Sequence, residues 1–328
     1  MKNNAQKAAR LSVAPMMDWT DRHCRYFHRV LSRHTLLYTE MVTAPALVRG
    51  GALHLLDYSP EEHPVALQLG GSDPGELAEA TRMAVDRGYD EVNLNVGCPS
   101  DRVQSGTFGA ILMKSPDLVA ACVEAMQSAA GDVPVTVKCR IGVDDQDPHV
   151  VLPDFIARLK AAGITRIQIH ARKAWLQGLS PKENRDIPPL DYDLVHRMKA
   201  AHPDLHLSIN GGIATLDAAM DHLKVMDGVM VGRAAYHQPY DILADADRRV
   251  YSVDNPVLTR EDAVFAMEDY IGAHVAAGGK LAQVTRHMLG IFAGQPGARR
   301  WKRILSDGGH RDGASFDLLR EALPPRAA

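Results

Sequence analysis

The 328-residue chain has few cysteines, few aromatic residues and no long apolar stretch. Its four cysteines are too few for a disulfide scaffold in a chain of this length. No run of about 18 apolar residues occurs, so the sequence predicts no membrane span. The first ten residues are polar and lack the apolar segment of a secretory signal. We therefore expect a reduced, cytoplasmic protein with no membrane partner.

The net charge is also small, at −3, which argues against indiscriminate binding to nucleic acid. One segment departs from this balance, because residues 280–303 contain six Lys or Arg and no Asp or Glu. An apolar fraction of 46% and a charged fraction of 23% are typical of a globular protein. These fractions exclude a disordered chain or a coiled coil as the main architecture.

Short apolar runs alternate with longer helical patterns over the first three quarters of the chain. The eight predicted strands are 11–15, 36–39, 65–69, 91–95, 135–138, 166–170, 205–210 and 228–231. The predicted helices between them are 74–87, 116–130, 153–162, 191–201 and 215–223. This alternation favours an α/β fold, a closed (β/α)8 TIM barrel. An open doubly wound sheet is the alternative, but no glycine-rich dinucleotide turn follows the first strand.

The pattern changes near residue 251, after which only helical spacing occurs. Asp254-Asn255-Pro256 is typical of a linker, and Thr259 followed by acidic residues is typical of a helix start. We therefore predict a barrel domain over residues 1–250 and a C-terminal all-helical domain over residues 255–328.

Polar residues end five successive predicted strands. They are Gln68, Asn95, Lys138, His170 and Asn210. Neighbours at a spacing of two residues extend the row: Asn93, Arg140 and Gln168. Any one of them could be a solvated strand end. Because active sites of this fold form at the carboxyl ends of the strands, five together favour a bound polar ligand.

Two glycine-containing turns follow the last two predicted strands. They are Asn210-Gly211-Gly212-Ile213 and Gly232-Arg233. Turns at these positions of a barrel commonly bind phosphate through backbone N–H groups, and an arginine adds a charge-assisted bond. A phosphate together with a polar ring system in the lumen suggests flavin mononucleotide (FMN). Lys138 would suit the negative charge that gathers on a reduced flavin.

Cys98 lies just beyond the fourth predicted strand, between a glycine and a proline. Most cysteines are buried apolar residues, and this is our interpretation of Cys24, Cys122 and Cys139. A thiol with an ordinary pKa of about 8.5 is protonated at neutral pH. Cys98 can therefore act as a general acid at the barrel mouth without special activation.

The motifs of the chain, taken together, resemble the tRNA-dihydrouridine synthases. The shared motifs are Ala14-Pro15-Met16-Met17, Gln68-Leu69-Gly70-Gly71, Asn95-Val96-Gly97-Cys98-Pro99-Ser100, Lys138-Cys139-Arg140, His170-Ala171-Arg172, Asn210-Gly211-Gly212-Ile213 and Gly232-Arg233. Two further segments are similar to subgroup A of that family, which is associated with uridines 20 and 20a of the tRNA D-loop. They are Met17-Asp18-Trp19-Thr20-Asp21-Arg22 and Asn184-Arg185-Asp186-Ile187-Pro188-Pro189-Leu190.

The resemblance implies an FMN-binding barrel, a helical domain that binds tRNA, and NADPH as the reductant. The implied FMN contacts are Pro15, Met16, Met17, Gln68, Lys138, His170, Asn210, Gly211, Gly212, Gly232 and Arg233. Cys98 is the implied proton donor. We expect contacts to uracil or tRNA from Asn95, Arg140, Arg172, Asn184, Arg185, Arg299 and Lys302. We expect no metal, and nothing in the sequence demands more than a monomer.

The expected reaction is reduction of the uracil 5,6 double bond, with hydride from FMN to C6 and a proton from Cys98 to C5. The target base must be flipped out of the tRNA to reach the flavin. Basic residues in the 171–190 loop and at 299–303 would contact the RNA. Two alternatives remain at this stage: a flavin barrel that reduces a free pyrimidine, and a tRNA-binding folding factor without catalytic activity.

Overall fold

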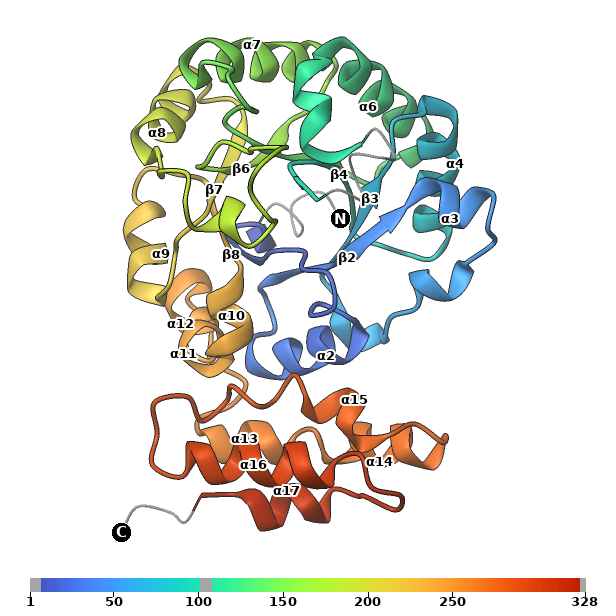
Figure 1. Ribbon diagram of the computed structural model, residues 1–328, viewed down its shortest axis with the longest axis vertical. Helices are drawn as coiled ribbons and strands as arrows, with labels where there is room; N and C mark the ends of the chain where they lie inside the picture. The colour runs from blue at the N-terminus through green and yellow to red at the C-terminus, as the bar shows by residue number, and fades with distance from the viewer. Residues whose placement is uncertain (1–6, 101–107, 325–328) are drawn as a thin grey trace.

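The computed structural model describes residues 7–100 and 108–324. Eight parallel strands pair in chain order, and the last pairs with the first, so the sheet closes into a barrel. Helices surround the strands, and a layer of helices from the C-terminal part of the chain lies below the barrel in Figure 1. The TIM barrel predicted from the strand–helix alternation is therefore confirmed.

The strands begin where the sequence predicts, with a difference of one residue for the seventh. Their bounds are β1 Leu11–Val13, β2 Leu36–Thr43, β3 Val65–Gly70, β4 Glu91–Val96, β5 Val135–Arg140, β6 Arg166–His170, β7 His206–Asn210 and β8 Gly228–Val231. Apolar and polar residues alternate along β4, which is fully buried. Since Asn93 on β4 donates to Gln168 on β6, which is not an adjacent strand, the polar side chains point into the lumen.

The barrel helices are α2 Arg22–Leu31, α3 Ala44–Val48, α4 Pro74–Asp86, α6 Pro116–Ala130, α7 Pro148–Ala161, α8 Tyr192–Ala201, α9 Leu216–His222, α10 Arg233–His237, α11 Pro239–Leu243 and α12 Ala246–Tyr251. Short 3-10 turns are η1 Leu53–Leu56, η2 Pro60–Glu62, η3 Gly109–Lys114 and η4 Glu183–Arg185. The predicted start of α7 at Pro153 is wrong. The helix begins at Pro148, where Asp147 caps it by accepting from His149 N–H at 2.9 Å, and Pro153 lies inside the helix.

The C-terminal helices are α13 Arg260–Phe265, α14 Glu268–Ala276, α15 Leu281–Thr285, α16 Ala298–Gly308 and α17 Asp317–Ala322. The fully buried Trp301 lies in their core, where its ring packs against Phe292 and its Nε1 donates to Met288 O at 3.1 Å. Thr259 forms the predicted helix cap with Asp262. Within the described residues, no helix is long and apolar enough to cross a bilayer.

A polar junction joins this layer to the barrel. Asp21 caps α2 and also lies 3.0 Å from His287 Nε2, while Arg286 donates to the same carboxylate. His23 contacts the Tyr270 hydroxyl at 2.7 Å. Because Asp21 follows the loop after β1 by only a few residues, the helical layer is anchored close to the barrel mouth.

Candidate active site

The five polar strand ends converge at the carboxyl-terminal end of the barrel. Asn95 is in register with Lys138, and His170 with Asn210, on neighbouring strands. Asn95 Nδ2 donates to Gln68 Oε1 at 2.8 Å, and Asn210 Nδ2 donates to Met230 O at 2.7 Å. The side chains predicted to line the mouth therefore lie together.

Two nitrogen groups at this mouth have no hydrogen-bond partner within residues 7–100 and 108–324. The His170 ring is buried, and its Nδ1 makes no hydrogen bond. Lys138 is half-buried, and among the described residues no acceptor bonds its ammonium group. Burial, and next the neighbouring Arg140, lower the pKa of Lys138 to about 8. Burial also lowers the pKa of His170 well below its usual range, followed by the effect of Arg140. An anionic or carbonyl-bearing ligand would satisfy these groups.

Glycines occupy the two turns that follow β7 and β8. Gly211 and Gly212 have φ of +108° and +71°, which an L side chain rarely adopts. A Cβ on Gly212 would lie 2.6 Å from Leu190 Cδ1, whereas a Cβ on Gly232 would meet nothing closer than 3.8 Å. Tyr192 donates to Gly211 O at 2.6 Å and so holds the first turn. The space beside Gly232 is therefore open, whereas Leu190 and Tyr192 pack against the Gly211–Gly212 turn.

The loop after β1 supplies the other predicted cofactor contacts. Pro15 is half-buried, Met16 is buried, and Met17 is 54% exposed. Thr20 Oγ1 accepts from Met16 N–H at 2.9 Å, which fixes the loop. Met16 Sδ lies near the space beside Gly232, at 4.0 Å from the position of a Cβ there. The first strand end and the eighth therefore meet at the mouth.

Cys98 is the half-buried cysteine, while Cys24, Cys122 and Cys139 are buried. Asn95 Oδ1 accepts from Cys98 N–H at 2.9 Å, and the Cys98 thiol lies 3.4 Å from Ser100 Oγ. Burial raises the pKa of Cys122 to about 11 and that of Cys139 to about 12. Access to the mouth therefore distinguishes Cys98 from the other three.

Two residues predicted to contact the substrate have other partners in the structure. The buried Arg140 donates from Nε to Gly97 O at 3.0 Å and from Nη1 to Asn184 O at 2.8 Å. Asn184 is fully buried and exchanges hydrogen bonds with the Trp175 backbone at 2.7 and 2.8 Å. Both side chains hold the 171–190 loop against the Cys98 loop. Burial of these polar groups could not be recognised from their positions in the sequence.

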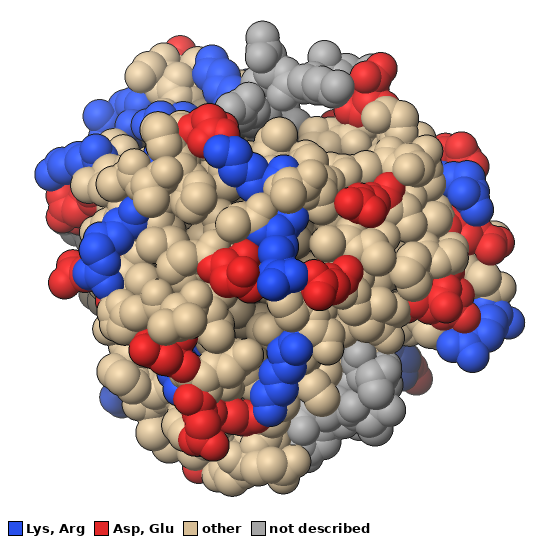
Figure 2. Space-filling model, turned by 90° about the horizontal axis from the view of Figure 1, so that it is seen from above, with Lys and Arg blue, Asp and Glu red and all other residues tan. Residues whose placement is uncertain are grey.

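Basic side chains also lie at the rim, where Arg172 is half-buried, and on the helical layer. Arg172 donates to Pro188 O, its Nε has no partner, and Arg185 is exposed. On α16, Trp301 and Leu305 are buried. The opposite side of that helix exposes Arg299, Arg300, Lys302 and Arg303. By contrast, the face seen in Figure 2 mixes Lys and Arg with Asp and Glu.

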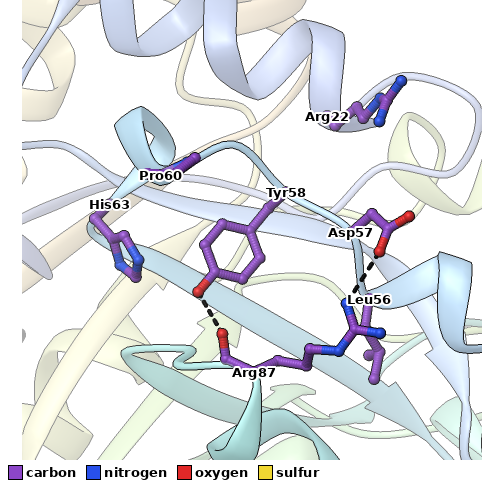
Figure 3. Close-up of a pocket in the computed structure, with 7 residues that line it drawn as sticks. All are labelled: Arg22, Leu56, Asp57, Tyr58, Pro60, His63 and Arg87. Atoms are coloured by element: carbon purple, nitrogen blue, oxygen red, sulfur yellow. Dashed lines mark hydrogen bonds and ion pairs between the residues drawn. The ribbon is translucent and has the colours of Figure 1, made fainter.

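A separate pocket of about 410 Å³ opens on the side of the barrel (Figure 3). The Tyr58 hydroxyl donates to Arg87 O, and the Arg87 guanidinium pairs with Asp57 at 3.1 Å. None of the predicted site residues lines this pocket. Its lining is Arg22, Leu56, Asp57, Tyr58, Pro60, His63 and Arg87.

Comparison with known families and proteins identifies the family of this chain. The family described as "Dihydrouridine synthase (Dus)" matches residues 12–327. The chain belongs to the dihydrouridine synthase family. It is 55% identical over 326 residues to the tRNA-dihydrouridine(20/20a) synthase of Shewanella oneidensis, covering 98% of this chain and 96% of that protein. It is 56% identical over 323 residues to the protein of the same name from Escherichia coli K12, covering 98% and 93% of the two chains.

Solved structures share the fold of this dihydrouridine synthase family member at low identity. TcOYE with pHBA has a TM-score of 0.54 and 10% identity, covering 77% of this chain and 92% of that chain. The old yellow enzyme homologue from Zymomonas mobilis has a TM-score of 0.52 and 13% identity, with the same coverage. At these identities the likeness establishes the barrel fold alone.

Proposed function

We propose that this protein reduces uridines 20 and 20a in the tRNA D-loop to dihydrouridine, using FMN and NADPH. The observation that carries the proposal is the grouping at one barrel mouth of the unpartnered His170 Nδ1 and the Lys138 ammonium with the half-buried Cys98. These groups match a flavin and an acid beside it. The relatives named for this activity, which are 55% and 56% identical, support the substrate.

The residues of the mouth fit FMN. Gly211, Gly212 and Gly232 would hold the phosphate with their backbone N–H groups, and Arg233 would add a charge. Lys138 and Gln68 would contact the polar edge of the ring system, with His170 near the ribityl chain. Pro15, Met16 and Met17 would cover its face. We propose that residues 1–250 hold the flavin and that residues 255–328 bind tRNA.

When bound, reduced FMN supplies a hydride to C6 of the uracil. Cys98 then gives its thiol proton to C5, which requires the thiol to face the base. Asn95 fixes the Cys98 loop through its Oδ1 and retains one N–H on Nδ2 for the base. Because the mouth lies at the end of the strands, a base stacked inside tRNA must leave its helix to reach Cys98.

We expect basic side chains at the mouth and on the helical layer to bind the RNA. Arg172 and Arg185 lie on the 171–190 loop at the mouth, and Arg299 and Lys302 lie on α16 of the helical layer. A base delivered to Cys98 leaves phosphates within reach of the rim, while the rest of the tRNA extends over the helices. We propose that the enzyme acts as a cytoplasmic monomer.

The decisive experiment is mass mapping of the D-loop. Unmodified tRNA transcript is incubated with the purified protein and NADPH, digested, and analysed for a gain of two mass units at each uridine. We expect the gain at positions 20 and 20a. Reduction of free uracil or orotate in place of tRNA would support a free-pyrimidine reductase. A colourless protein that binds tRNA without any mass gain would support a folding factor, and either result would overturn the proposal.

A further inference from the structure

The Cys98 loop is held by one end of a hydrogen-bonded chain that runs down the barrel lumen. Asn95 Oδ1 accepts from Gly97 N–H at 3.0 Å and from Cys98 N–H at 2.9 Å. The Asn95 amide in turn donates from Nδ2 to Gln68 Oε1 at 2.8 Å. Gln68 Nε2 then donates to Asn93 Oδ1 at 2.8 Å. All three amide side chains are buried, so water cannot readily substitute for these partners.

Below Asn93 the chain divides into two branches that meet again at Glu91. In one branch, Asn93 Nδ2 donates to Thr136 Oγ1 at 2.8 Å, and the Thr136 hydroxyl donates to Glu91. In the other, Asn93 Nδ2 donates to Gln168 Oε1 at 2.9 Å, and Gln168 Nε2 donates to Tyr38 Oη at 3.1 Å. The Tyr38 hydroxyl donates to Glu91 Oε1 at 2.6 Å.

The carboxylate at the lower end fixes the direction of every bond above it. Glu91 is fully buried and paired with Arg166, so its oxygens act only as acceptors. Burial, and next the nearby Glu91, raise the pKa of Tyr38 well above its usual range, so its hydroxyl remains a donor. Because Glu91 only accepts hydrogen bonds, the donor and acceptor roles above it are fixed. Each amide side chain then has one orientation that satisfies both of its neighbours.

An amide that turned over would place two donors or two acceptors against each other. At Asn95 this reversal would point Nδ2 at the N–H groups of Gly97 and Cys98 and release the loop. Glu91 is therefore connected to Cys98 through a series of hydrogen bonds, although Glu91 itself does not contact the mouth of the barrel.

We infer that Glu91, with Tyr38 and Thr136, is a positioning group that sets the Asn95 amide and thereby holds Cys98 for proton transfer. We call the hydrogen-bonded chain from Glu91 to Asn95 the relay. The inference rests on the proposed function only for the role of Cys98, because the relay itself consists of hydrogen bonds in the structure. The two branches are redundant because each alone connects Asn93 to Glu91. The relay therefore predicts that either branch can be lost without much effect, and that losing both is severe.

The test compares Tyr38→Phe, Thr136→Val and the double variant. Tyr89→Phe and Thr81→Val, alone and together, are matched controls, because both are buried and donate their hydroxyls to backbone carbonyls outside the relay. Two readouts are needed. One is the rate of Cys98 alkylation by iodoacetamide, followed by peptide mass analysis, with the fully buried Cys24 and Cys139 as internal references. The other is the single-turnover rate of tRNA uridine reduction, beside the rate of flavin reduction by NADPH.

We expect each single variant to behave like its control. In the double variant we expect Cys98 alkylation to rise about fivefold, as when one hydrogen bond is lost. Uridine reduction should fall by about 10- to 100-fold because the acid is misplaced, with flavin reduction unchanged. A second double variant combines Tyr38→Phe with Thr136→Ser, which keeps the hydroxyl of the Thr136 branch. Its alkylation and reduction rates should be those of Tyr38→Phe alone. A double variant that matches the double control, or losses that simply add, would overturn the inference.

If the double variant does not fold, a different variant tests the relay. Asn93→Leu keeps the side-chain volume similar and removes the point where the branches join. It should reproduce the faster alkylation and slower uridine reduction, whereas unchanged Cys98 alkylation would refute the relay. Alkylation needs no tRNA, so a failure of the proposed function would appear as absent uridine reduction in the unsubstituted protein, separately from any failure of the relay.

Discussion

Arg233 and Asp186 form a two-point ion pair at the barrel mouth, with Arg233 Nη2 2.7 Å from Asp186 Oδ1 and Nη1 3.2 Å from Oδ2. The arginine follows the Gly232 turn, and the aspartate belongs to the 171–190 loop. Arg233 is the guanidinium proposed to bind the FMN phosphate. Asp186 therefore holds the same cation that the phosphate would contact and adds a negative charge beside it.

Asp186→Asn should increase the affinity of the flavin-free protein for FMN. The gain should be at most about fivefold, because exposed ion pairs contribute up to about 1 kcal/mol, and both side chains are partly exposed. Arg233→Gln should decrease the affinity. Quenching of FMN fluorescence measures both. Asp217→Asn, which removes an acid paired with Arg249, is the control. Weaker FMN binding by Asp186→Asn would show that the carboxylate orients Arg233 instead.

Lys138→Met should stabilise the flavin-free protein at pH 7, by about 1–2 kcal/mol after allowance for solvent. The pKa of Lys138 falls from 10.5 to about 8 on folding. Below about pH 8 both states carry the charge, and the folded state bears its full desolvation cost. Between the two values the folded state loses the proton first, so wild-type stability rises with pH.

The stability difference between wild type and Lys138→Met should consequently shrink near pH 10. Urea unfolding of the two proteins at both pH values measures it. Addition of FMN should reverse the order of stability at pH 7, because the bound anion favours the lysine cation. A difference that does not depend on pH would place the Lys138 ammonium in solvent.

The strands and their polar ends could be predicted from the sequence because their pattern is local. Alternating residues such as Glu91, Asn93 and Asn95 fix which side chains share a face. Partners across the barrel could not be predicted in this way. Arg140 has the sequence position of a substrate contact, yet its bonds to Gly97 and Asn184 depend on how two distant loops pack.

The same reason explains why Glu91 and Asp186 were missed. Glu91 begins a strand and Asp186 lies in a loop, both ordinary places for a solvated acid. Only the closed barrel brings Tyr38, Thr136 and Arg166 to Glu91. The start of α7 was missed for a local reason, since Pro148 and Pro153 are both acceptable first residues of a helix.

Cys98→Ala should leave flavin content and tRNA affinity unchanged and slow uridine reduction by about 10²–10⁴-fold, the usual cost of losing a positioned acid. Cys122→Ala is the control because that thiol is buried on α6. Single-turnover reduction of tRNA by the reduced enzyme measures the step. A rate within twofold of wild type would mean that another group, or water, protonates C5.

Asp21→Ala should destabilise the fold more than Asp21→Asn. Asparagine retains the cap on α2, which contributes about 1 kcal/mol, and both variants lose the charge facing Arg286 and His287. Burial alone would raise the pKa of Asp21, but the hydrogen bonds and charge of His287 lower it well below its usual range. Its stabilisation is therefore complete above about pH 4 and is lost as the pH falls further.

Urea unfolding of these variants at pH 7 and near pH 3 provides the measurement. The gap between wild type and Asp21→Asn should narrow at the lower pH. Asp73→Asn is the control, because Asp73 also caps a helix, α4, where its side chain accepts from Glu76 N–H at 2.8 Å. This variant should lose little free energy of unfolding at either pH. If Asp21→Asn were equally mild at pH 7, the charge at the barrel–helix junction would contribute nothing to stability.

Arg299→Glu combined with Arg303→Glu should weaken tRNA binding at least about tenfold without loss of flavin. Both residues are exposed on α16, away from the buried Trp301, so the fold should tolerate the change. If each cation neutralises one phosphate, the slope of log affinity against log salt should fall by about two. Filter binding across a salt series measures it. Arg82→Glu with Lys224→Glu makes the same change in charge at two exposed sites of the barrel, one on α4 and one in the turn after α9. Equal weakening by this control pair would mean that net charge, rather than the α16 surface, governs the affinity.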